Sequence, residues 1–102
     1  SDPSWERGEE GWVNIAPGGL ERLLKSISSD YPSLPIVITE NGACVKGEHN
    51  ESVPLVERLK DEYRIRYLRQ NLMEARDAVR DGVKLHGYFI WSLMDNLEWN
   101  DG

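Results

Sequence analysis

Two short apolar segments of this chain, residues 35–39 and 85–92, each run directly into polar and aromatic residues. The first segment reads PIVITENG over Pro35–Gly42, so residues with strand character lead into a carboxylate, an amide and a glycine. A buried parallel strand brings a polar side chain to the edge of a sheet in this way. The pattern predicts two buried strands with chemically active residues at their carboxyl ends.

The residues before the first strand predict a helix over 17–30. Its apolar residues follow the i, i+3, i+4, i+7 spacing of an amphipathic helix, and they are Leu20, Leu23, Leu24 and Ile27. Tyr31 precedes Pro32, and a residue before proline avoids helical angles. The helix is therefore expected to end at this point.

A second, longer helix is predicted over 55–81, between the two strands. Its apolar stripe consists of Tyr63, Tyr67, Leu68, Leu72, Ala75, Ala78 and Val79. The Asp81–Gly82 pair is typical of a helix C-terminus. The remaining residues, 1–16, 42–54 and 93–102, are predicted to be loops.

This order of helix, strand, helix and strand predicts an α/β fold. Two successive strand–helix units imply parallel strands joined by a crossover helix. Two strands alone do not form a stable sheet, and no helix follows the last strand to cover it. The 102 residues are therefore interpreted as part of a larger barrel, incomplete at both ends.

Composition argues against several function classes. The chain has 12 basic and 18 acidic residues and a net charge of −6, which disfavours nucleic acid as a partner. Its longest apolar run is too short for a membrane span. His49, His86 and Cys44 do not give the spacing of a zinc site. No metal and no cofactor are expected.

Two motifs identify a family resemblance. Thr39–Gly42 reads TENG, and residues 91–99 read WSLMDNLEW. In this order and at this spacing, the motifs resemble glycoside hydrolase family 1, which includes the β-glucosidases and β-galactosidases. The resemblance covers nearly the whole chain. It implies a (β/α)8 TIM barrel, of which residues 1–102 are the C-terminal part of the single barrel domain and supply the seventh and eighth strands with their helices.

The resemblance also implies roles for individual residues. Glu40 matches the catalytic nucleophile, and Trp91 matches the platform beneath the sugar ring. Glu98 matches the carboxylate that binds two sugar hydroxyls, and Trp99 matches the indole that donates to a neighbouring hydroxyl. The family often has a cis peptide bond after the residue that matches Trp91.

The expected chemistry is that of a retaining β-glycosidase acting on a small-molecule β-glycoside. Such enzymes use two carboxylates, one as nucleophile and one as general acid/base. The family's acid/base lies in an Asn-Glu-Pro motif that this chain lacks. The isolated chain is therefore expected to be inactive. The carboxylate of Glu98 would repel a sugar phosphate, which favours an unphosphorylated sugar.

Other interpretations remain open at this point. From the residues alone, Glu40 could be a polar strand end, Trp91 a core aromatic residue and Glu98 a solvated loop carboxylate. The parent protein could be a non-catalytic binding protein with this fold, or a thioglucosidase-like relative that replaces the acid/base. Arg64 is singled out as a possible structural arginine within an otherwise solvated set.

Overall fold

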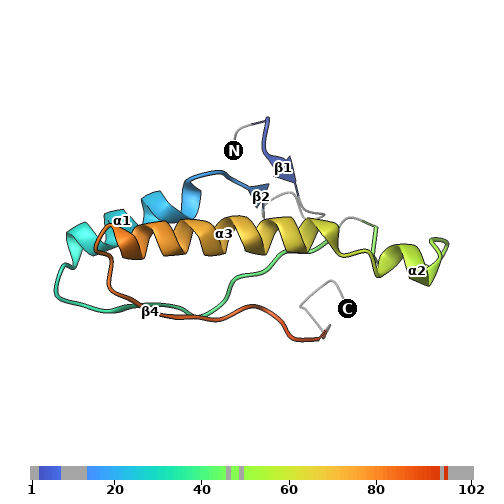
Figure 1. Cartoon of the computed structure of the whole chain (residues 1–102). Coiled ribbons are helices and arrows are strands. Elements are labelled where there is room, and N and C mark those ends of the chain that lie inside the picture. Colours follow the sequence, from blue (N-terminus) through green and yellow to red (C-terminus); the bar gives the residue numbers. More distant parts are fainter. Residues whose placement is uncertain (1–2, 8–13, 46, 49, 95, 97–102) are drawn as a thin grey trace.

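The computed structural model describes residues 3–7, 14–45, 47–48, 50–94 and 96. Two helices lie side by side over a pair of strands (Figure 1). The elements, in chain order, are β1 (Glu6–Arg7), β2 (Asn14–Ile15), α1 (Gly19–Asp30), β3 (Ile36–Ile38), α2 (Leu55–Arg58), α3 (Glu62–Arg80) and β4 (Leu85–Tyr88).

Helix α1 confirms the helix predicted before the first strand. It begins at Gly19, slightly later than expected, and ends at Asp30. The N–H of Tyr31 still donates to the carbonyl of Ile27, at 2.9 Å, before Pro32 leads the chain away. Leu24 is the most buried of its apolar residues, at 2% exposure.

The prediction of one helix over 55–81 is wrong, because the helix is divided into α2 and α3. The break falls at residues 59–61, and Asp61 is the N-cap residue of α3. Aspartate competes with the backbone for hydrogen bonds and therefore favours caps over helix interiors. Its carboxylate accepts a 3.0 Å bond from Arg64 one turn later.

The C-terminus of α3 confirms the Asp81–Gly82 signal. Gly82 has φ +100°, a left-handed conformation that favours glycine. The N–H of Val83 donates to the carbonyl of Ala78, and that of Gly82 donates to Val79, both at 3.0 Å. This is the Schellman arrangement, which satisfies the last carbonyls of a helix.

Strands β3 and β4 pair in parallel, as predicted. Their register pairs Ile36 with Leu85 and Ile38 with Tyr88, and it is irregular after Ile36. Both strands are shorter than the predicted 35–39 and 85–92. Pairing nevertheless continues past β4, because the N–H of Phe89 donates to the carbonyl of Ile38 at 2.9 Å.

The prediction that residues 1–16 form only a loop is wrong at two places. β1 and β2 form a short antiparallel pair. The carboxylate of Glu6 in β1 binds the guanidinium of Arg66, which belongs to α3. This ion pair links the N-terminal segment to the long helix, and the contact between residues 60 positions apart carries no local sequence signal.

The hydrophobic core lies between the two long helices and the parallel strands. It consists of Leu24, Ala75, Ala78 and Val83, with Leu20, Ile36, Ile38, Leu85 and Tyr88 packed against it. Ala75 and Ala78 thus confirm part of the predicted stripe of α3. Leu23, Leu72 and Val79 are about half exposed, because α1 and the strands cover only part of each apolar stripe.

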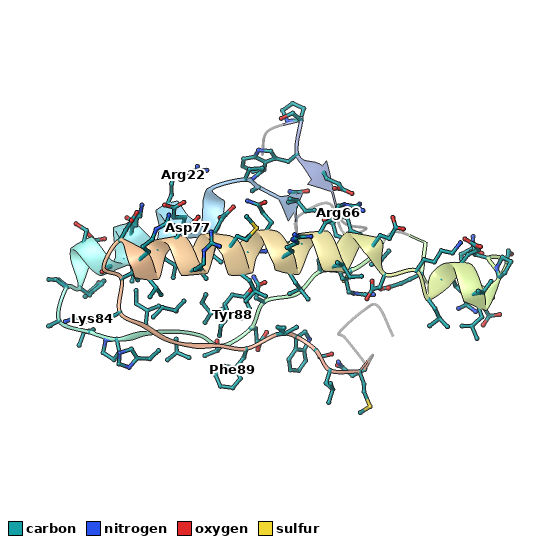
Figure 2. The ribbon with its side chains drawn as sticks, viewed as in Figure 1. Arg22, Arg66, Asp77, Lys84, Tyr88 and Phe89 are labelled. Atoms are coloured by element: carbon teal, nitrogen blue, oxygen red, sulfur yellow. The ribbon has the colours of Figure 1, made fainter. Side chains whose placement is uncertain are left out.

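The face of the sheet opposite the helices is open in this chain. Val37 and Phe89 are 48% and 60% exposed. Figure 2 shows Tyr88 on the side of β4 that faces α3 and Phe89 on the other side. Parallel strands are normally covered on both faces, so this apolar face is of the kind that a complete barrel encloses.

Candidate functional site

The predicted nucleophile lies just beyond the carboxyl end of β3. Glu40 follows Ile38 by two residues, and it is exposed. Asn41 and Gly42, which follow it, are partly buried. The segment thus presents a carboxylate on the surface while its neighbours are held against the protein.

Trp91 lies beside this segment, at the carboxyl end of β4. Its N–H donates to the carbonyl of Asn41 at 3.0 Å. A Cβ atom built on Gly42 would be 1.8 Å from the carbonyl oxygen of Trp91. The structure therefore brings the segment of Glu40 and the backbone of Trp91 together. The bond between Trp91 and Ser92 is cis, as the family resemblance led us to expect.

Asn41 connects three elements through its side chain and backbone. Its Oδ1 accepts a 2.5 Å hydrogen bond from the hydroxyl of Tyr88 in β4. Its Nδ2 donates to the hydroxyl of Tyr67 in α3, at 3.3 Å. Sequence analysis did not single out this contact, and the only signal for it was the position of Tyr67 on the inner stripe of the helix.

Burial raises the pKa of both tyrosines above the ordinary value of 10. Desolvation, followed by the charge of Tyr67, raises the pKa of Tyr88 to about 12. Desolvation also raises the pKa of Tyr67, against the opposing hydrogen bonds with Asn41 and Asn71. The Tyr88 hydroxyl is the donor in its hydrogen bond with Asn41.

Arg64 holds the loop that follows the strand end. Its Nε donates to the carbonyl of Ala43 at 2.8 Å, and one terminal nitrogen donates to the Glu48 carboxylate at 2.5 Å. The other terminal nitrogen binds Asp61. Arg64 is only 28% exposed, which confirms the expectation that it is a structural arginine.

A buried carboxylate that sequence analysis missed supports the layer behind the site. Glu74 in α3 is 5% exposed. It accepts hydrogen bonds from the backbone N–H groups of Gly18 at 2.6 Å, Leu20 at 2.8 Å and Glu21 at 3.2 Å. The Nε2 of Gln70 donates to it at 2.9 Å. Negative charge at a helix N-terminus is favourable, so Glu74 caps α1 from another helix.

Glu98 and Trp99, the other two predicted sugar-binding residues, lie outside the described residues, as does Asp95. The described part of the last loop is held locally. The hydroxyl of Ser92 donates to the carbonyl of Met94 at 2.6 Å, and the Nδ2 of Asn96 donates to the Ser92 hydroxyl at 3.0 Å. Asn96 therefore supports the segment that follows Trp91.

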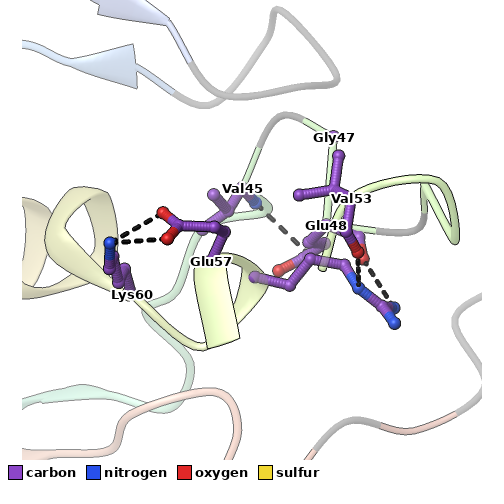
Figure 3. A pocket seen from close by; sticks show the side chains of 7 residues that line it. Val45, Gly47, Glu48, Val53, Glu57 and Lys60 are labelled. Carbon is purple, nitrogen blue, oxygen red and sulfur yellow. Dashed lines mark hydrogen bonds and ion pairs between the residues drawn. The ribbon is translucent and has the colours of Figure 1, made fainter. Parts of the chain in front are cut away.

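A cavity lies in the loop region after the site, and its wall does not include Glu40 or Trp91. Figure 3 shows that the charged residues of its wall bind one another or the local backbone. Lys60 binds Glu57 at 2.7 Å, and the Nε of Arg58 donates to the carbonyl of Val53 at 3.1 Å. The cavity is thus a feature of loop packing, separate from the strand ends.

The described residues contain no group of three histidine, cysteine, aspartate or glutamate side chains suited to a metal ion. Within the same part of the chain, none of the helices combines the length and apolar character needed to cross a membrane.

Comparison with known proteins gives consistent matches. The sequence profile described as "Glycosyl hydrolase family 1" matches residues 1–102. "Beta-glucosidase 12" of Oryza sativa subsp. indica is 42% identical over 91 residues, which are 89% of this chain and 18% of that protein. "Lactase/phlorizin hydrolase" of Rattus norvegicus is 40% identical over 102 residues, 100% of this chain and 5% of that protein.

Solved structures show the same relationship. The crystal structure of beta-glucosidase 2 from the fungus Trichoderma reesei, in complex with Tris, superposes with a TM-score of 0.86 at 39% identity. The match covers 95% of this chain and 21% of that one. The chain therefore spans about a fifth of the length of the rice and fungal relatives. Its α/β fold is part of the TIM barrel of these proteins. By sequence along its whole length and by structure, this chain belongs to glycosyl hydrolase family 1.

Proposed function

We propose that this chain supplies the nucleophile side of the active site of a retaining β-glycosidase of the β-glucosidase kind. The observation that carries the proposal is the position of Glu40, which is exposed at the carboxyl end of β3 and is followed by Asn41, whose carbonyl binds the backbone N–H of Trp91 at the end of β4. Active sites of TIM barrels lie at the carboxyl ends of their strands. The names of the relatives support the same reaction class.

In the proposed reaction, the ionised Glu40 attacks the anomeric carbon of a β-glycoside. A bond forms between a carboxylate oxygen and that carbon, while the bond to the leaving oxygen breaks. A second carboxyl group, contributed by a part of the barrel beyond these residues, protonates the leaving oxygen and then takes a proton from water. Water cleaves the glycosyl ester and regenerates the Glu40 carboxylate.

Trp91 is the proposed platform for the sugar. The residue is 48% exposed, and an indole face complements the C–H face of a sugar ring. Glu98 and Trp99 are the proposed hydroxyl-binding residues of the same loop. The charge of Glu98 favours a neutral sugar over a phosphorylated one, so the proposed substrate is a small unphosphorylated β-glucoside or β-galactoside.

The proposed place of this chain is the C-terminal part of the barrel, with β3 and β4 as its seventh and eighth strands. In that position the open face that carries Val37 and Phe89 is enclosed by the other strands. We expect these residues in isolation to hydrolyse no aryl β-glucoside, because they lack the acid/base. Turnover by the isolated chain that Glu40→Gln abolishes would contradict this expectation.

The nucleophile is tested in the complete natural protein that carries this sequence. Glu40→Ala is expected to lower kcat on an aryl β-glucoside by about 10⁴-fold or more, because the covalent intermediate can no longer form. Added azide is expected to restore part of the activity by attacking in place of the carboxylate. Glu62→Gln, at a carboxylate 79% exposed on α3, is the matched control. Near-normal activity of Glu40→Ala would refute the proposal.

A further inference from the structure

We propose that Asn41 is a positioning residue that, clamped by Tyr88 and Tyr67, fixes the direction of the nucleophile Glu40 and its distance from Trp91. The inference rests on the proposed function, in which Glu40 attacks and Trp91 supports the sugar. It assigns a role in the same reaction to residues that do not touch the substrate.

Asn41 makes contacts with both α3 and β4. Its backbone carbonyl accepts from the N–H of Trp91, at 3.0 Å. Its side chain accepts from Tyr88 at 2.5 Å and donates to Tyr67 at 3.3 Å. The residue after Glu40 therefore binds Trp91 beyond β4, Tyr88 within β4 and Tyr67 in α3.

The backbone is held on both sides of Glu40. The carbonyl of Ile38 is held by the N–H of Phe89, at 2.9 Å, and the carbonyl of Asn41 is held by Trp91. Between these two hydrogen bonds the chain advances three residues, from Ile38 to Asn41, while the partner segment advances two, from Phe89 to Trp91. Such an extra residue re-aims side chains and is common at barrel rims and beside active sites. Glu40 lies within this offset, between two fixed carbonyls.

Both tyrosine hydroxyls bind the side-chain amide of Asn41. Each lies on a partly buried side chain, and each is within hydrogen-bond distance of the Asn41 amide. An amide with one acceptor and two donors binds two hydroxyls in only one orientation when one hydroxyl donates and the other accepts. The two tyrosines therefore define the rotation of Asn41, and with it the backbone that carries Glu40.

A clamp of this kind affects catalysis through geometry. A displacement of about 1 Å in a reacting group can cost about 100-fold in rate. Removal of one hydroxyl leaves the Asn41 amide with one tyrosine partner, and we expect about a tenfold loss in the rate of nucleophilic attack. Removal of the amide in Asn41→Ala is expected to cost about 100-fold.

The test uses the complete natural protein and the variants Tyr88→Phe, Tyr67→Phe and Asn41→Ala. Each is treated with 2-deoxy-2-fluoro-β-D-glucosyl fluoride, which traps the nucleophile as a glycosyl ester. The trapping rate constant and the apparent binding constant are obtained separately. The rate is expressed per mole of protein that carries the label at completion. Tyr31→Phe is the matched control, because Tyr31 is 59% exposed at the other end of the sheet, beyond α1.

The proposal predicts a lower trapping rate constant in the three variants, with little change in the binding constant and none in Tyr31→Phe. A purely structural role would lower the labelled fraction and leave the rate constant per labelled molecule unchanged, and that result would overturn the proposal. An unchanged rate in all variants would also overturn it. Failure of the proposed function is seen separately, as normal activity of Glu40→Ala or as label on another residue.

Discussion

Gly42 lies against the carbonyl of Trp91 so closely that a Cβ atom at Gly42 would stand 1.8 Å from that oxygen and 2.9 Å from its carbon. The contact is between backbones, and neither can give way by a side-chain rotation. The carboxyl ends of the two parallel strands therefore approach each other as closely as they do only because residue 42 lacks a side chain.

Gly42→Ala is expected to destabilise the complete protein by about 2 kcal/mol or more and to reduce kcat strongly, because Trp91 must move away from the strand end. Chemical unfolding and kinetics on an aryl β-glucoside measure both effects. Gly19→Ala is the control, since a Cβ atom there meets only the side chain of Ala16, at 3.3 Å. Equal effects of the two substitutions would show that the close approach of Gly42 to Trp91 is unimportant.

Glu74→Gln is expected to cost about 3 kcal/mol of unfolding free energy. The substitution removes a charge that accepts three backbone hydrogen bonds, and it turns an amide NH₂ group toward N–H donors. Urea unfolding of the complete protein measures the loss. The same substitution at Glu62, on the exposed side of α3, is expected to change stability by less than about 0.5 kcal/mol. A similar small effect at Glu74 would argue against its role as the cap of α1.

Arg64→Lys is expected to release the loop at residues 43–48. A lysine cannot bind the Ala43 carbonyl and the Glu48 carboxylate at the same time as Asp61. Limited proteolysis is expected to cleave this loop faster in the variant. Arg76→Lys serves as the comparison, because Arg76 is 62% exposed and binds only its neighbour Asp77 among the contacts found in the described residues. Unchanged cleavage would show that the loop is held by other contacts.

The raised pKa of Tyr88 predicts a loss of stability in alkali. Its pKa is about 12 in the folded protein, against an ordinary value of 10. Between these values the unfolded chain has released the proton that the folded protein retains, so the unfolding free energy falls as pH rises. Tyr88→Phe is expected to make this fall shallower, whereas Tyr31→Phe is not. Urea midpoints across this pH range measure the slopes, and equal slopes for both variants would contradict the assignment.

Much of the layout could be predicted from local pattern. The apolar spacing of α1, the Tyr31–Pro32 stop and the Asp81–Gly82 end each act over a few residues, and each is present in the structure. The parallel pairing of β3 and β4 also followed from the intervening helix. The break before Asp61 was missed, and Asp61 makes no side-chain hydrogen bond to the start of α3 that would mark it.

The contacts that hold the candidate site could not be predicted from the pattern. Asn41 meets Tyr67 across 26 positions and Tyr88 across 47, and Glu74 meets Gly18 across 56. Such contacts depend on the packing of elements that are distant in sequence. Glu40 and Trp91 were identified from motif resemblance, and their roles stay predictions, as do those of Glu98 and Trp99.

The cap that Glu74 provides has a consequence for the order of events during synthesis. The donors at the start of α1 are made 53 to 56 positions before the carboxylate that satisfies them. Ribosomes add roughly 5–20 residues per second. For several seconds, therefore, the nascent helix has water in place of Glu74 at its first turn. The capping hydrogen bonds at the start of α1 can form only after α3 has been synthesised, so the N-terminus of α1 is completed together with α3.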